Sequence, residues 1–386
     1  MRRFLSCALL ALALVTPRAA RAGVTNPDIS VIGQPTLTWN DVAGDPSSKR
    51  PVFDVGETEF VFDAALNPYA KGYFTISLAD GQADVEEGYF SLLRGLPGDI
   101  QVKGGKYRVG FGKLNPAHPH TYPFAERFGV LAAYLPGDEA FNETGLDVSY
   151  RLPLPGTISV TAYGDLLQGD SFRIPRPPSA NPNDPLVVDP VNGDRALEPR
   201  TAWLGRLAAF VPVGDRSGVE LGISATQGTN NVAANARTAI YGGDAKAKLW
   251  TSANAYLLLQ GEYLHLQRDI ASWIGPTGPY DVSTLRRDGG YLFADFNWKQ
   301  RYNVGASVDR YEDPVRLGES VTSAGLFAGL ALMEETTAFR LDWRRSERSG
   351  QTVPFAPGPS AVSFDPVQHV TLRVIYSMGP HKAHQF

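Results

Sequence analysis

A two-residue alternation of apolar and polar side chains constrains this chain more than any other feature of its sequence. It recurs in segments of about eight to twelve residues that Gly, Pro, Asn and Asp separate, and helical periodicity is scarce throughout. One such segment alternates Ile158, Val160, Ala162, Gly164 and Leu166 with Ser159, Thr161, Tyr163 and Asp165. Since successive side chains of a strand point to opposite faces, the pattern predicts an all-β chain whose strands each have one polar and one apolar face.

The charge on the polar faces decides what kind of β protein this is. Acids and bases occur there in similar numbers, and they are too many to be buried between the sheets of a soluble sandwich. The connections also alternate between tight turns, such as those at residues 67–68 and 300–301, and long segments near residues 112–142, 169–199, 267–287 and 347–366. Short turns at one end and long loops at the other are typical of an outer-membrane barrel, in which the apolar faces meet lipid.

The strand count sets the size of the expected barrel. Residues 55–378 contain fifteen alternating segments, and residues 28–39 supply a sixteenth. We therefore predict a transmembrane antiparallel up-and-down β-barrel of about 16 strands, with 14 to 18 as the limits, wide enough for an aqueous channel. Trp298 and Tyr302 flank a short turn, whereas Trp203 and Trp343 fall near long loops, as two interfacial aromatic girdles would require.

The first 22 residues predict export. They combine a basic start, an apolar run at residues 4–15 and small residues at 20–22, which together indicate a secretory signal peptide. Of the 36 basic residues of the chain, four lie in this segment, so 32 remain against 40 acidic ones, and the mature net charge is near −8. The only cysteine, Cys7, leaves with the signal, which excludes disulfides and cysteine-based zinc sites from the barrel at residues 23–386.

Residues 103–142 form the stretch with the most specific features. A basic strand that contains Lys103, Lys106 and Arg108 breaks at Gly112, and about thirty residues rich in His, Pro and aromatics follow before alternation resumes. We expect residues 112–142 to fold inward as a constriction loop. Its candidate functional residues are Lys113, Asn115, His118, His120 and Arg127.

The side-chain parity of this strand needs an explanation. Without an irregularity, Lys106 and Arg108 share a face with Val102 and would point to lipid, at a cost of roughly 2–4 kcal/mol per charge. We favour a bulge at Gly104-Gly105 that shifts the register by one residue. The side chains that face lipid are then Tyr107, Val109 and Phe111, and those expected to line the pore and set its selectivity are Lys103, Lys106, Arg108, Arg206, Arg340 and Arg344.

These residues carry a resemblance to known families. The sequence Lys103-Gly104-Gly105-Lys106-Tyr107-Arg108-Val109-Gly110-Phe111-Gly112, with the polar and aromatic loop behind it, resembles the corresponding strand of phosphate-selective porin O/P-like outer-membrane proteins. The segments at residues 26–30, 115–120 and 379–384 resemble a second group, of which some members are described as zinc-regulated or TonB-dependent outer-membrane proteins. The resemblance implies a barrel, and for the first group an anion channel. The expected lumen of this chain mixes bases with acids, so anion selectivity does not follow.

The histidines suggest one specific chemistry. His118 and His120, with Glu126 and Glu139 nearby in sequence, offer nitrogen and oxygen ligands for zinc. The alternative is that both histidines pack and form hydrogen bonds within a loop that its prolines stiffen, and in that case the protein has no cofactor. His381 and His384 lie beyond the last strand, in residues 379–386, which we interpret as a short tail rather than as a continuation of the closing strand.

The remaining motifs exclude several function classes. The sequence contains no P-loop, HExxH or GxSxG motif, so we expect no enzyme, and the acidic charge argues against nucleic acid. The leading hypothesis is a porin-like channel in the cell outer membrane for passive diffusion of small hydrophilic solutes or ions. The alternative is a ligand-binding or gated uptake protein for zinc or a metal complex. The expected partners are outer-membrane lipid, the solute and, in a homotrimer, two further copies of the chain.

Overall fold

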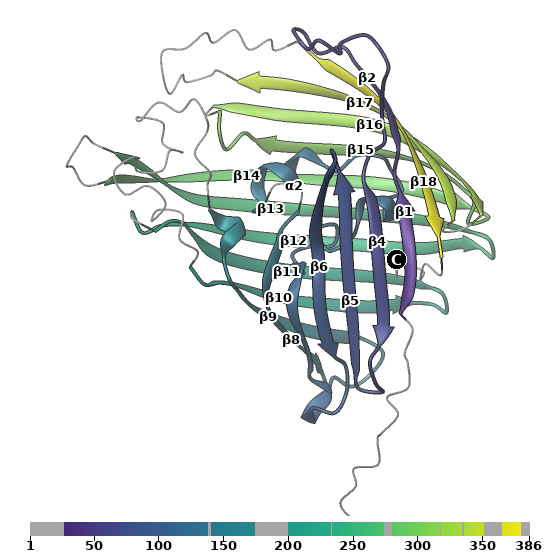
Figure 1. Cartoon of the computed structure of the whole chain (residues 1–386), viewed down its shortest axis with the longest axis vertical. Helices are drawn as coiled ribbons and strands as arrows, with labels where there is room; N and C mark the ends of the chain where they lie inside the picture. Colours follow the sequence, from purple (N-terminus) through teal and green to yellow (C-terminus); the bar gives the residue numbers. More distant parts are fainter. Residues whose placement is uncertain are drawn as a thin grey trace, which may run out of the picture.

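The computed structural model describes residues 27–137, 140–173, 200–232, 234–273, 280–316, 318–333, 336–350 and 365–379. The predicted signal peptide and all but the first residue of the predicted tail lie outside these ranges. Within them, the chain forms one antiparallel sheet that closes on itself (Figure 1). No helix in the described part is long and apolar enough to cross a membrane.

The strands follow one another around the barrel in chain order. Their bounds are β1 (Asp28–Gly33), β2 (Thr36–Asn40), β3 (Val52–Asp54), β4 (Thr58–Ala65), β5 (Ala70–Ala79), β6 (Gln82–Leu92), β7 (Gln101–Arg108), β8 (Asn142–Leu152), β9 (Ser159–Leu167), β10 (Ala202–Val213), β11 (Ser217–Asn231), β12 (Ala236–Ser252), β13 (Ala255–Trp273), β14 (Tyr280–Trp298), β15 (Tyr302–Glu312), β16 (Glu319–Met333), β17 (Thr337–Gly350) and β18 (Val367–Met378).

The barrel has sixteen wall strands in its described part, as the sequence predicts. β1 and β2 pair in turn with β18 and are separated by Gln34-Pro35, so together they form one wall strand. β3 and β4 pair with β2 and β1 and form the second. The other fourteen strands each span the wall once, and the pairing of β18 with β1 and β2 closes the barrel. The predicted fold class is therefore confirmed.

The connections depart from the predicted alternation in length. The two-residue turn Asp80-Gly81 joins β5 to β6 at the end of the barrel where the long loops lie. The long connection predicted at residues 267–287 is mostly strand, because β13 and β14 stay paired as far as Trp273 and Tyr280. Polar side chains such as Asp269 and Thr284 occupy this extension. The polar sequence here therefore indicates strands that continue beyond the lipid-facing zone, and not a loop.

The two faces of the wall differ as the alternation requires. On the outside, Leu292, Val304, Leu326 and Leu341 are each about half exposed, at 56%, 58%, 58% and 49%. On the inside, Phe293 and Phe327 are almost fully buried. A water-soluble barrel of this size would show the opposite pattern, so the outer face fits lipid.

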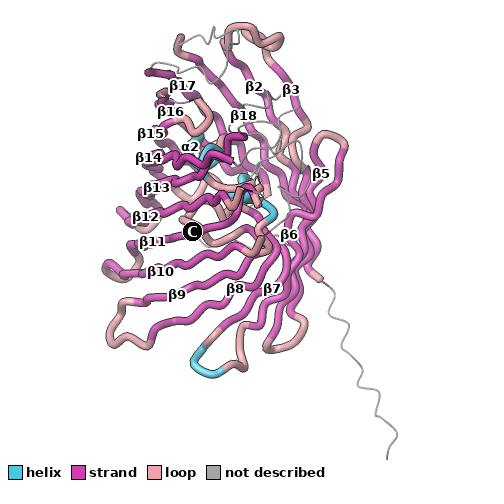
Figure 2. Tube along the Cα trace, turned by 90° about the vertical axis from the view of Figure 1, so that its left-hand side faces the viewer, coloured by secondary structure: helices cyan, strands magenta, loops and turns pink. Residues whose placement is uncertain are grey.

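What buries the inner aromatic residues is the chain between β7 and β8. Residues 109–141 enter the barrel and contain a single 3₁₀ turn, Pro119–Thr121, and one short helix, α2 (Gly129–Tyr134). In Figure 2, α2 lies beside β14 within the curve of the wall. We call residues 109–141 the inner loop.

Candidate functional site

A sharp turn directs the inner loop into the barrel. β7 ends at Arg108, the amide of Phe111 donates to the carbonyl of Val109 at 2.8 Å, and Gly112 adopts a positive φ of 64°. A Cβ atom on Gly112 would lie 2.0 Å from Oε2 of Glu262 on β13. The position therefore requires glycine both for its backbone conformation and for its close approach to the wall.

Three wall carboxylates bind backbone amides of the inner loop. Glu262 accepts hydrogen bonds at 2.8 Å from the amides of Lys113 and Leu114. Asp342 accepts from the amides of residues 125 and 126 at 2.9 and 3.2 Å, and Asp309 accepts from that of residue 129 at 3.1 Å. A buried carboxylate is stable only when its lone pairs are satisfied, so these acids and the loop's free amides stabilise each other.

Wall bases bind the carbonyls of the same segment. Arg340 donates to the carbonyl of Tyr122 at 3.2 Å, and Arg344 donates to the carbonyls of residues 126 and 127, each at 3.0 Å. Asn303 donates to the carbonyl of Pro123 at 3.1 Å. The sequence assigned Arg340 and Arg344 to the pore lining. In the structure both lie inside the barrel, but their guanidinium groups hold the inner loop.

An aromatic cluster completes the attachment to this part of the wall. Phe128 stacks on Tyr291, with ring centroids 4.2 Å apart and an interplanar angle of 15°. Phe124 packs edge-on against Phe293 at 5.1 Å and against Phe327 at 5.6 Å. Burial of several aromatic rings gives the loop a hydrophobic core of its own, which fixes it to β14 and β16.

Asn115 closes the base of the loop. Its amide nitrogen donates to the carbonyls of Val109 and Phe141, and its Oδ1 accepts from the amide of Phe141 at 2.9 Å. The same oxygen accepts from the guanidinium of Arg127 at 3.1 Å. Two residues that the sequence proposed as constriction residues, Asn115 and Arg127, thus join the entry and exit of the loop.

A cavity of about 420 Å³ with both charged and apolar lining residues remains inside the barrel. It lies between the inner loop and the wall from β7 to β14. Its charged lining residues are Lys103, Arg108, Lys113, Asp147, Asp165, Arg206, Glu220 and Lys246. Acids and bases thus face the same space.

Several of these charges are paired. Arg206 binds Asp244 through two hydrogen bonds, of 2.6 and 2.9 Å, and Lys113 forms an ion pair with Glu220. Lys103 lies over the ring of Tyr107, with its Nζ 4.8 Å from the ring centroid, and 4.0 Å from a carboxylate oxygen of Asp147. Lys103 and Arg206 therefore line the interior, where the sequence placed them.

The predicted bulge at Gly104-Gly105 is wrong. The pairing of β7 with β6 and with β8 runs through both glycines without a register shift. Gly105 has a φ of 135°, and a Cβ there would lie 2.2 Å from the carbonyl oxygen of Gly88, so the glycine serves a close approach of two strands. As a result Tyr107, Val109 and Phe111 are buried inside the barrel and do not face lipid.

The irregularity lies in the neighbouring strand. Thr75 pairs with Glu87 and Ile76 with Val85, which leaves Glu86 as the extra residue of a bulge in β6. The pairing between β6 and β7 then ends at Gly88 and Lys106. In the described structure β7 therefore has no ladder partner on this side beyond Lys106. Lys106 and Arg108 avoid lipid without a bulge in β7.

Each of these bases contacts the end of β6 that pairs with β5 but not with β7. Lys106 reaches the carbonyl of Val85 at 2.5 Å and the carboxylate of Asp84 at 3.5 Å. Arg108 is buried, and its Nε donates to Glu86 at 2.9 Å while its Nη1 donates to the carbonyl of Ala117 at 3.1 Å. Lys106 therefore covers a strand edge, and Arg108 joins the loop to β6.

The 3₁₀ turn places both loop histidines. Pro119 starts the turn, and the amide and hydroxyl of Thr121 both donate to the carbonyl of His118. This geometry puts the rings of His118 and His120 5.5 Å apart, and both are buried. The sequence proposed that the two histidines act together, and the structure places them side by side.

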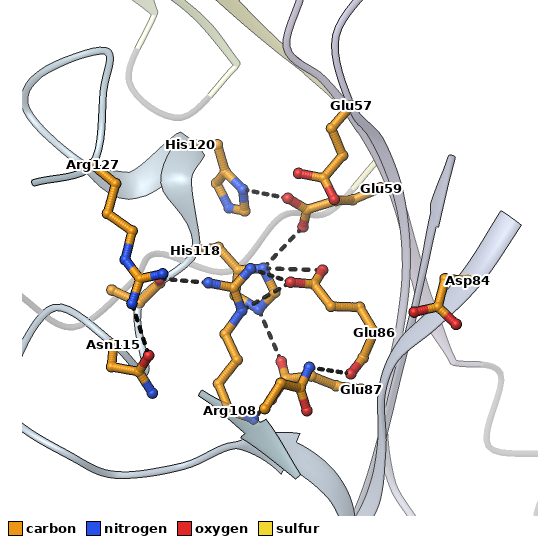
Figure 3. A network of polar contacts seen from close by, with 12 residues as sticks. Glu57, Glu59, Asp84, Glu86, Glu87, Arg108, Asn115, His118, His120 and Arg127 are labelled. Atoms are coloured by element: carbon orange, nitrogen blue, oxygen red, sulfur yellow. Dashed lines mark hydrogen bonds and ion pairs between the residues drawn. The ribbon is translucent and has the colours of Figure 1, made fainter. Parts of the chain in front are cut away.

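Carboxylates from two wall strands surround these histidines (Figure 3). Nε2 of His118 lies 2.8 Å from Glu87, and its Nδ1 lies 3.3 Å from Glu59 and 3.6 Å from Glu86. Nδ1 of His120 lies 3.1 Å from Glu59. Burial disfavours a charged imidazole, but the attraction of Glu59 and the hydrogen bonds to the carboxylates outweigh it and raise the pKa of His118 to about 10.

The predicted acidic partners of the histidines are different residues. Glu126 lies elsewhere, where it contacts Thr371 and Arg344, and Glu139 is outside the described residues. Glu59 alternates with the apolar residues Phe60 and Phe62 of β4, but nothing in the sequence connects it with a loop some sixty residues away. Glu86 was missed because the bulge in β6 reverses the parity of its side chain.

Comparisons with known proteins agree with this architecture. No family model matches the chain. The chain is 31% identical over 274 residues to an uncharacterised protein of Aquifex aeolicus, a match that covers 68% of this chain and 55% of that protein. The chain thus spans about half the length of this relative.

Solved structures with the same architecture come from several bacteria. The anion-selective porin from Comamonas acidovorans has a TM-score of 0.56 at 12% identity, over 92% of this chain and 100% of that one. The fold is that of outer-membrane porins. OmpT of Vibrio cholerae, folded in vitro, has a TM-score of 0.53 at 12% identity, over 94% and 100% of the two chains. The outer-membrane channel DcaP of Acinetobacter baumannii has a TM-score of 0.54 at 10% identity, over 91% of this chain and 97% of that one. At these identities the likeness concerns the fold alone.

Proposed function

We propose that this protein is an outer-membrane channel through which small hydrophilic solutes or ions diffuse passively, and that the inner loop narrows it. One observation carries the proposal. Most contacts of the inner loop come from the wall between β13 and β18, with a second set from β4, β6 and β7, and a cavity lined by charges of both signs remains between the loop and strands β7 to β14. Charged side chains that face a common space require water around them.

The lining charges suggest weak ion selectivity. Arg340 and Arg344, which the sequence counted as selectivity residues, bind loop carbonyls, and Arg206 is neutralised by Asp244. The lysines of the lining are Lys103, Lys113 and Lys246, and the lining acids Asp147, Asp165 and Glu220 offset them. The proposed channel therefore passes small ions of either sign, and selectivity for phosphate stays a prediction from the sequence resemblance.

The place and assembly of the channel are also proposals. The predicted signal peptide and the half-exposed apolar outer face support insertion in the outer membrane with the short turns on the periplasmic side. One similar structure, with a TM-score of 0.50, is described as a trimer form of Vibrio cholerae OmpT. For this chain, assembly of three copies can be tested by sedimentation of the folded protein in detergent.

Cysteine labelling during conductance measurements tests the channel. Because Cys7 lies in the predicted signal peptide, the mature chain offers a background without thiols. A Lys103→Cys variant should give steady single-channel currents that fall when a charged methanethiosulfonate reagent is added. The matched control, Leu292→Cys, places the thiol on the outer face and should show no change. Absence of conductance, or equal effects in the two variants, would contradict the proposal.

We do not extend the histidine cluster to metal uptake. His118 is only 5% exposed and lies next to three wall carboxylates. An ion held by several buried ligands leaves slowly, whereas a transported ion must leave its site readily.

A further inference from the structure

The histidine cluster contains three buried atoms that meet at ion-pair distance around one imidazole nitrogen in the described structure. They are Oε2 of Glu59, Oε2 of Glu86 and Nδ1 of His118, and Nδ1 lies 3.3 and 3.6 Å from the two oxygens (Figure 3). These residues are 0%, 7% and 5% exposed. One imidazole proton can satisfy at most one of the two oxygens, and an unsatisfied buried polar atom is costly, so their convergence requires an explanation.

We propose that Glu59, Glu86 and His118, together with His120, form a binding site for one divalent metal ion of the zinc class. None of these four residues lines the cavity of the proposed channel. The proposed metal site therefore goes beyond the proposed function. Imidazole nitrogen and carboxylate oxygen are ligands that Zn²⁺ accepts in tetrahedral sites.

In each of these three side chains, the second polar atom already has a hydrogen-bond partner. Oε1 of Glu59 accepts from Gln34 at 3.0 Å, and Oε1 of Glu86 accepts from Arg108 at 2.9 Å. Nε2 of His118 faces Glu87 at 2.8 Å. A histidine that donates one ring N–H to a carboxylate presents the lone pair of its second nitrogen, and this arrangement orients histidine ligands in metalloproteins. Gln34, Arg108 and Glu87 thus aim the three free atoms inward.

The two distances from Nδ1 of His118 fit a tetrahedral ion. Zinc bonds of about 2.0–2.2 Å require neighbouring ligand atoms to be about 3.3–3.6 Å apart. Nδ1 of His118 lies 3.3 Å from Oε2 of Glu59 and 3.6 Å from Oε2 of Glu86. One ligand atom from each of Glu59, His118 and His120 lies within 4.8 Å of the others. A small rotation of His120, which now faces Oε1 of Glu59, would supply the fourth ligand.

The charge of the cluster also fits a divalent cation. Glu57, Glu59, Glu86 and Glu87 bring four negative charges to the cluster, and Arg108 offsets one of them. Three negative charges remain when both histidines are neutral, and one Zn²⁺ would offset two of them.

Metal binding would join the inner loop to a second part of the wall. Glu59 lies on β4 and Glu86 on β6, whereas the contacts of Glu262, Asp309, Asp342, Arg340 and Arg344 with the loop come from β13 to β17. The ion would therefore fix the tip of the histidine turn to the side of the barrel that those contacts leave free.

Equilibrium dialysis of the folded, detergent-solubilised mature chain against Zn²⁺ tests the proposal. We expect one Zn²⁺ per chain that excess Ca²⁺ does not displace. Affinity should fall at least tenfold in Glu59→Gln and in His118→Asn, and about 10- to 100-fold in Glu87→Gln, which keeps every proposed ligand. The matched control, His381→Ala/His384→Ala, removes two histidines of the tail and should bind like the unaltered chain.

Three results would overturn the proposal. They are no Zn²⁺ binding by the unaltered chain, unchanged binding in the folded Glu59→Gln and His118→Asn variants, and loss of binding only in the tail variant. If the ligand variants do not fold, the visible spectrum of the unaltered chain with Co²⁺ decides. Intense tetrahedral bands support the site, and a weak octahedral spectrum refutes it.

Discussion

Asp342 on β17 accepts a hydrogen bond at 2.9 Å from the backbone amide of Ala125, a residue 217 positions earlier in the chain. The same oxygen accepts from the next amide as well. A wall side chain thus holds the backbone of the inner loop, whose position does not depend on the identity of the loop side chains at these two residues.

Removal of this acceptor should loosen the loop. Asp342→Ala leaves buried amides without a partner, which costs about 1–3 kcal/mol. We expect larger and noisier single-channel currents in planar bilayers. Asp342→Asn keeps one acceptor oxygen and removes the charge, so it should stay closer to the original protein. Equal currents in Asp342→Ala and the unaltered channel would show that this contact does not position the loop.

The aromatic cluster should contribute more to stability than any single hydrogen bond. Phe128 is 1% exposed and stacks on Tyr291, so Phe128→Ala should lower the free energy of unfolding by about 3–5 kcal/mol. Urea unfolding in lipid vesicles measures the change. Val315→Ala provides the control, because that side chain lies in the connection between β15 and β16, is 56% exposed and should matter by about 0.5 kcal/mol or less. Similar losses in both variants would contradict a packed core inside the barrel.

Gly112 tests the entry of the loop. Gly112→Ala must adopt a left-handed conformation, at about 1–2 kcal/mol, and its Cβ would also meet Glu262. Gly156→Ala has the same kind of backbone, with a φ of 93°, but nothing within 4 Å of its Cβ. Unfolding experiments should therefore show a clearly larger loss at position 112. An equal loss of unfolding free energy at the two positions would mean that the Glu262 side chain moves away from the new Cβ without cost.

Charge reversal in the cavity should change ion selectivity. Lys103→Glu replaces a base of the cavity lining with an acid, so the reversal potential in a salt gradient should shift toward cation preference. The control is Lys299→Glu, which makes the same change at an exposed turn beside Trp298. If both variants shift the potential equally, the cavity is not the path of the ions.

The sequence by itself determined the class of fold and the inner face of most strands. Alternation with a period of two is a local property, and a strand such as β9 or β4 shows it without reference to the rest of the chain. It placed Lys103 and Arg206 inside the barrel and predicted about sixteen wall strands. The count was attainable because each strand is bounded by turn-forming residues.

The tertiary structure alone decided what the inward-facing residues do. Arg340 and Arg344 have the parity of pore-lining residues, but they bind the loop because its carbonyls lie within reach. The side chain of Glu86 faces inward because of a bulge in the pairing of β6 with β5. The meeting of Glu59 with His118 requires the loop to return to the first strands of the barrel, and no local pattern encodes a contact between segments that only barrel closure brings together.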